Sequence, residues 1–108
     1  MENRLKKIRQ EIDKVDDELI ARLTHRMRLA RELGKLKAEN HLPIHDPERE
    51  EFIINRLSKA AGDYLTKDHL RKIYKTIFSI AQDIEYQESN ASVIGVENSS
   101  KDPRTKTQ

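Results

Sequence analysis

The sequence has no cysteine and no tryptophan, and its 108 residues include only three glycines, three prolines, three tyrosines and two phenylalanines. Without cysteine there is neither a disulfide framework nor a thiol nucleophile. No apolar run approaches the length of a membrane span and no signal-peptide core begins the chain, so we expect a cytoplasmic protein. So few aromatic side chains offer little on which nucleic-acid bases could stack.

Charged residues make up 37% of the chain and hydrophobic residues 35%, which is thin for the core of a single monomeric domain. The net charge of +2 is too small to argue for a nucleic-acid partner. We interpret the local basic block between Arg22 and Lys37 as a solvated face with one or two inward members. The four histidines lack metal-ligand spacing, so no metal site is expected.

One very long helix is predicted at the start, because no proline and only Gly34 interrupt the segment between Asn3 and Glu39. Its apolar positions follow heptad spacing: Leu5, Ile8, Ile12, Val15 and Leu19. Such a helix would be about 55 Å long, whereas a compact domain of this size has a radius of gyration of about 13 Å. A second copy of the chain would cover the excess, so we predict an intertwined homodimer.

Two shorter helices are predicted next. Asp46 as N-cap and Pro47 at the first helical position begin the second helix, which Gly62 ends. Thr66 caps a third helix that we expect to end near Gln87. The fold class is therefore all-α, a three-helix protomer, with a domain at 1–88 and a polar, mobile tail at 89–108.

Several charged residues fall where the helical pattern expects apolar ones. Arg26, seven residues after Leu19, occupies a heptad position of the first stripe, and Lys37, eleven residues later, projects from nearly the same face. Arg9 lies about 100° away around the axis, so if all three cations serve one ligand, Arg9 would do so for a neighbouring subunit. Glu85 lies on the inner stripe of the third helix, and Glu50 at the start of the second. Together they predict a pocket for a small polyanion.

Each residue alone has a plainer interpretation. A charged residue at a heptad core position such as Arg26 also fixes helix register, and Lys37 near a helix C-terminus complements the helix dipole. Asp46 serves as an N-cap without any ligand, and Glu50 pairs readily with Arg49. The joint occurrence of these residues, rather than any one of them, indicates a site.

The combined spacings resemble those of the all-helical chorismate mutases, the AroQ class. The resemblance rests on Arg9 within Ile-Arg-Gln-Glu-Ile-Asp, on Arg26, on the Gly-Lys-Leu-Lys run ending at Lys37, and on the segment 46–50, Asp-Pro-Glu-Arg-Glu. It covers about residues 3–88. It implies interlocked three-helix protomers that rearrange chorismate to prephenate in phenylalanine and tyrosine biosynthesis, without cofactor, metal or covalent intermediate.

The resemblance also implies residue roles. Arg26 and Arg9 of the partner chain would clamp the substrate carboxylates, and Lys37 would donate to the breaking ether oxygen. Glu85 falls where many relatives carry Gln as a second donor, so it would have to be protonated. We expect activity to fall as pH rises, and Glu85→Gln to flatten that profile.

The ring hydroxyl would be held by Glu50 and the Asp46 backbone, with Arg49 in support. Ala81 stands where some relatives carry a Ser that contacts a substrate carboxylate, so that carboxylate lacks one donor and KM should be weaker. The alternatives are an isochorismate-pyruvate lyase, a non-catalytic mutase-like regulatory domain and a purely structural bundle. Glu50 argues against the lyase, whose known members lack an acid there. The sequence leaves open whether another shikimate-pathway enzyme is fused to this chain or docks onto it.

Overall fold

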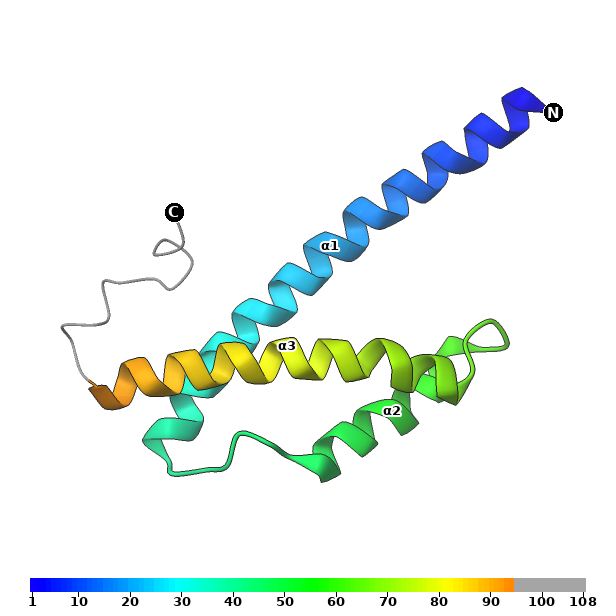
Figure 1. Ribbon diagram of the computed structural model, residues 1–108. Coiled ribbons are helices and arrows are strands. Elements are labelled where there is room, and N and C mark those ends of the chain that lie inside the picture. Colours follow the sequence, from blue (N-terminus) through cyan, green and yellow to red (C-terminus); the bar gives the residue numbers. More distant parts are fainter. Residues whose placement is uncertain (95–108) are drawn as a thin grey trace.

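The structure, a computed structural model, describes the backbone of residues 1–94 and the side chains of residues 1–90. It contains three helices, α1 (Glu2–Glu39), α2 (Pro47–Ala61) and α3 (Lys67–Ile94), and no strand in the described part (Figure 1). The all-α, three-helix prediction is confirmed. No helix within residues 1–94 combines the length and apolarity needed to cross a membrane.

The ends of α2 follow from local sequence signals. The Asp46 carboxylate accepts a hydrogen bond from the Arg49 backbone N–H at 3.1 Å, and Pro47 stands at the first helical position. At the other end, Gly62 has a φ of +71°, a left-handed conformation that glycine adopts without the strain imposed by a Cβ. The predicted boundaries of this helix are therefore confirmed.

The third helix begins as predicted but extends further. Thr66 and His69 cap its N-terminus reciprocally: the His69 N–H donates to Thr66 Oγ1, and the Thr66 N–H donates to His69 Nδ1, both at 3.1 Å. Its end at Ile94 shows that the predicted end near Gln87 is wrong, because no proline or glycine interrupts the chain before residue 95. The predicted tail is thus helical at residues 89–94, and its remainder lies outside the described residues.

Packing is concentrated in one half of the molecule. The C-terminal part of α1 lies against α3, which also packs on α2, whereas α1 and α2 are held apart (Figure 1). Ala30 on α1, Ile53 and Ile54 on α2, and Leu70 and Ala81 on α3 form the small buried core. The radius of gyration is 17.9 Å, against about 13 Å for a compact chain of this length.

The tightest approach between helices is at Gly34. A Cβ placed on this residue would lie 2.7 Å from both the Cα and the carbonyl oxygen of Glu85. Only a residue without a side chain allows α1 and α3 to come this close. The approach brings Lys37, one turn later on α1, next to Glu85.

Candidate active site

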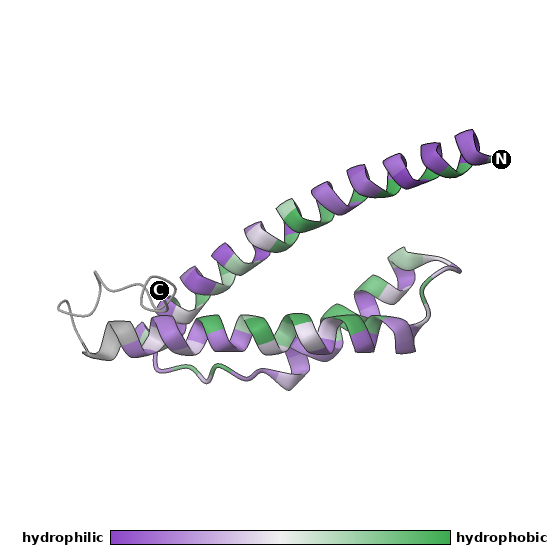
Figure 2. Ribbon diagram, turned by 45° about the horizontal axis from the view of Figure 1, so that its top comes forward, coloured by the Kyte–Doolittle hydropathy of each residue, from purple (hydrophilic) through white to green (hydrophobic). Residues whose placement is uncertain are grey.

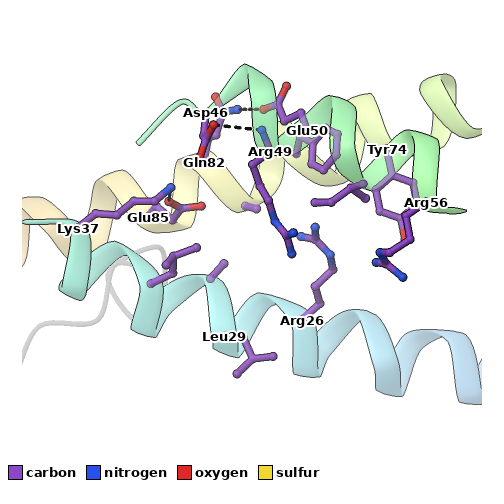
Figure 3. A pocket seen from close by; sticks show the side chains of 15 residues that line it. Arg26, Leu29, Lys37, Asp46, Arg49, Glu50, Arg56, Tyr74, Gln82 and Glu85 are labelled. Atoms are coloured by element: carbon purple, nitrogen blue, oxygen red, sulfur yellow. Dashed lines mark hydrogen bonds and ion pairs between the residues drawn. The ribbon is translucent and has the colours of Figure 1, made fainter. Parts of the chain in front are cut away.

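A cavity of about 340 Å³ lies between α1 and α2 and has α3 as its floor (Figure 3). Its polar and charged lining comes from all three helices and the loop before α2: Arg26, Lys37, Asp46, Arg49, Glu50, Arg56, Tyr74, Gln82 and Glu85. Its apolar lining consists of Leu29, Ala30, Leu33, Ile53, Phe78 and Ala81. The volume is at the small end of the range for ligand pockets, which favours a compact ligand.

Most residues predicted from the sequence meet in this cavity: Arg26, Lys37, Asp46, Arg49, Glu50, Ala81 and Glu85. Arg9 does not. It lies on the projecting part of α1, where residues 1–22 are all exposed. Within one chain the structure therefore assembles every predicted site residue except the one expected to act on a neighbouring subunit.

Lys37 and Glu85 form a nearly buried ion pair at one end of the cavity. Lys37 Nζ donates to Glu85 Oε1 at 2.7 Å and to the Ile44 carbonyl oxygen at 2.8 Å, and the two side chains are 13% and 7% exposed. An ammonium group has three N–H donors, so one remains for a ligand. Because Glu85 is held by a cation and Lys37 by two acceptors, both groups have fixed positions at the cavity wall.

Arg26 and Arg49 supply positive charge to the middle of the cavity. Their side chains reach toward one another from α1 and α2 (Figure 3). The Arg26 guanidinium lies 5.7 Å from the centroid of the Tyr74 ring and 5.8 Å from that of Phe78. Within the described residues, neither guanidinium has a salt bridge to a carboxylate. Two adjacent cations lacking a carboxylate partner favour an anionic ligand between them.

The opposite wall carries a carboxylate with a defined partner. Glu50, in the first turn of α2, accepts a hydrogen bond on Oε2 from Gln82 Nε2 at 2.8 Å, and His45 Nε2 lies 3.7 Å from the same oxygen. The Asp46 side chain caps the N-terminus of α2, a structural role that needs no ligand. The cavity thus presents cations at its centre and one end and an acceptor at its side.

Gln82 and Arg56 also line the cavity, although no sequence motif pointed to them. Arg56 follows Arg49 by seven residues, two helical turns, and so shares its face of α2. Gln82 lies three residues before Glu85 and adjoins Ala81. The helical spacing of Arg56 from Arg49, and of Gln82 from Glu85, was the sequence signal that could have identified them. No group of three or more His, Cys, Asp or Glu side chains suited to a metal occurs in the described part of the chain.

Fold and site together define an all-helical protein with a small, mainly cationic ligand cavity. A family model described as chorismate mutase type II matches residues 8–86. The chain belongs to this family, which confirms the resemblance drawn from its motifs.

Individual relatives agree with this assignment. The chorismate mutase of Methanocaldococcus jannaschii is 30% identical over 70 residues, covering 65% of this chain and 71% of that protein. The bifunctional chorismate mutase/prephenate dehydratase of Aquifex aeolicus is 40% identical over 85 residues, 75% of this chain but only 24% of that protein. A solved structure of the Thermus thermophilus chorismate mutase is 35% identical with a TM-score of 0.73, covering 77% of this chain and 94% of that one. The chain therefore spans about a quarter of the bifunctional relative.

Proposed function

We propose that this chain is a chorismate mutase, an isomerase that rearranges chorismate to prephenate. The observation that carries the proposal is the convergence of Arg26, Arg49 and Lys37, with Glu50 opposite, in one cavity of a chain from this family. Chorismate carries two carboxylates, a ring hydroxyl and an ether oxygen. The cavity offers donors for the first and last of these groups and an acceptor for the hydroxyl.

The reaction breaks the ether C–O bond while a C–C bond forms, with no proton transfer to or from the protein. Catalysis then depends on holding the folded conformer of the substrate and stabilising negative charge on the ether oxygen. Arg26 would bind one carboxylate of the substrate. A hydrogen bond to a charged group contributes about 1.5–3 kcal/mol of stabilisation. The remaining N–H of Lys37 would donate to the ether oxygen.

The role of Glu85 depends on its proton. In the structure Glu85 Oε1 accepts from Lys37, so an ionised Glu85 helps hold the ammonium group in place. A protonated Glu85 would in addition donate its own O–H to the ether oxygen. We predict that turnover is faster when Glu85 carries this donor, which makes turnover depend on pH. Glu85→Gln, which keeps a donor at every pH, should flatten the profile. Initial rates at a series of pH values measure this, and an unchanged profile in the variant would remove Glu85 from the chemistry.

The site would be completed by a second copy of the chain. Arg9 lies on the exposed part of α1, whose apolar stripe has no cover within one protomer. In an intertwined homodimer, Arg9 of the second copy would reach the cavity and bind the second carboxylate. The relatives in which the mutase is fused to a prephenate dehydratase support a further partner, an enzyme that consumes prephenate, fused or docked.

The direct test follows the loss of chorismate absorbance with purified protein. We expect turnover by the wild type and a loss of about a hundredfold or more in kcat for Lys37→Ala, the typical effect of removing one donor to a developing oxyanion. Lys35→Ala is the matched control, because Lys35 is an exposed lysine of the same helix outside the cavity. Absence of turnover would refute the proposal, and salicylate fluorescence from isochorismate would then identify the lyase alternative.

A further inference from the structure

The Glu50 carboxylate belongs to a flexible side chain that two neighbouring cavities can reach. Glu50 lines the cavity already described and also a second cavity, of about 420 Å³, between α2 and α3. Its side chain is 28% exposed, and a free Glu side chain loses up to about 2 kcal/mol of conformational entropy when it is fixed. A carboxylate in this position needs a partner that selects one orientation.

Positive charge in the second cavity would attract the Glu50 carboxylate away from the proposed substrate. Arg71 and Lys75, both on α3, line it and bring positive charge to the far side of Glu50. Glu51 already accepts two hydrogen bonds from Arg71, both at 2.9 Å, which shows that α3 cations capture carboxylates from this turn of α2. Without a restraint, Glu50 would be divided between the two sides.

Gln82 is the restraint that the structure provides. Its Nε2 donates to Glu50 Oε2 at 2.8 Å (Figure 3), and Gln82 itself lines both cavities. A carboxylate only accepts, so the nitrogen of the Gln82 amide must face it. Among the described residues nothing donates to Glu50 Oε1, because both Gln82 and His45 approach Oε2. One oxygen is therefore held and the other is left for a ligand.

We propose that Gln82 is a positioning residue, whose side-chain amide holds Glu50 Oε2 so that Oε1 accepts the hydrogen bond of the substrate ring hydroxyl. The inference rests on the proposed mutase function and extends it to a residue that makes its contribution through Glu50. Being uncharged, the amide orients the carboxylate without neutralising it. A cation in the same place would compete with the hydroxyl for the charge of Glu50.

Kinetics in two backgrounds test this role. Gln82→Leu keeps the approximate size but removes the donor, and we expect kcat/KM for chorismate to fall about tenfold, the lower end for losing a hydrogen bond to a charged group. In a Glu50→Ala background the same substitution should change kcat/KM less than twofold, because no side-chain acceptor remains to be positioned. Equal losses in both backgrounds, or no loss in the wild-type background, would overturn the proposal.

A pH profile separates positioning from simple helix packing. In Gln82→Glu two carboxyls face each other, so activity should be low at pH 7 and recover in acid, where one shared proton restores a donor to Glu50. Gln82→Leu should show no such recovery. Gln87→Leu, at an exposed position of the same helix, is the control and should retain full activity. Recovery of both variants in acid, or of neither, would contradict a role through Glu50.

A measurement independent of turnover distinguishes failure of this inference from failure of the mutase assignment. In ¹⁵N-labelled protein, the Gln82 side-chain amide resonance should shift as Glu50 titrates, and the shift should disappear in Glu50→Gln. If the wild type does not turn over chorismate, the proposed function fails, while a titrating amide still supports the hold on Glu50. A Gln82 amide resonance that does not shift as Glu50 titrates overturns the inference even if the enzyme is active.

Discussion

The two halves of α1 have different surroundings. In the C-terminal half, Ala30 and Gly34 are buried against α3, and the half-exposed Leu29 and Leu33 line the cavity. In the N-terminal half, hydrophobic residues recur along one side of the projecting helix (Figure 2), and Val15 and Leu19 remain 58% and 54% exposed. A sequence pattern specifies which face of a helix is to be buried, but not whether the same chain supplies the cover.

The difference also separates the predicted site residues. Arg26 and Lys37 come from the covered half and face a cavity that one chain builds, whereas Arg9 comes from the uncovered half. Exposed apolar stripes of this length are typical of an interface. In the proposed dimer, association of the chains and completion of the site would be one event, and experiments on each half of α1 should have different outcomes.

The largest effect is expected from a charge in the uncovered stripe. Ile12→Asp would bury an unpaired carboxylate in the proposed interface, a cost of several kcal/mol, and should give a monomer with at least about a hundredfold less activity. Gln10→Asp makes the same charge change on the opposite face and should leave both properties intact. Sedimentation velocity and chorismate turnover measure the two. A wild type that sediments as an active monomer would contradict the proposed dimer.

Mixing variants tests whether the two halves of α1 serve one site from different chains. Arg9→Ala and Arg26→Ala should each be nearly inactive alone. If chains exchange, half of all dimers in the mixture contain one chain of each variant. Each of these heterodimers has one intact site, so about a quarter of all sites should regain activity. Turnover before and after co-refolding measures the recovery. No recovery would mean that each site is built within a single chain.

A smaller effect is expected in the covered half, at Gly34. Alanine in place of glycine inside a helix is normally stabilising, by about 1 kcal/mol. Here the added Cβ would lie 2.7 Å from the backbone of Glu85, so Gly34→Ala should instead destabilise the fold by about 1–3 kcal/mol. Urea unfolding measures the sign. Thr24→Ala, at an exposed position of α1, reports the propensity gain without the contact, and a stabilised Gly34→Ala would mean that the helices separate freely.

These contrasts also indicate what the sequence could predict. The ends of α2 follow from Asp46, Pro47 and Gly62, because capping and turn residues act within a few positions of themselves. The end of α3 was predicted too early, because polar residues without proline or glycine do not stop a helix. Local signals specify where elements begin more reliably than where a segment without a breaker ends.

Within the site, the sequence indicated the inward charges but not the contacts that orient them. Periodicity placed Lys37 and Glu85 on inner faces. The hydrogen bond from Gln82 to Glu50 joins residues 32 positions apart on different helices. Such a contact depends on how α2 and α3 cross, which no pattern along a single helix contains. The close approach at Gly34 was missed for the same reason.

The smallest effect is expected for the exposed pair that ties α2 to α3 within one chain. The hydrogen bond from Arg71 holds the pKa of Glu51 below its usual range. A lowered carboxyl pKa stabilises the fold above the unfolded-state pKa, about 4.3, and the contribution is lost as pH falls through the folded-state value. Arg71→Gln should therefore be slightly less stable than the wild type at pH 7, and urea unfolding at a series of pH values should show that difference shrinking in acid. Because the pair lies away from the uncovered half of α1, the sedimentation of the variant should be unchanged. A variant that dissociates would instead show that the α2–α3 packing governs the proposed interface, and the two halves of α1 would then not be independent.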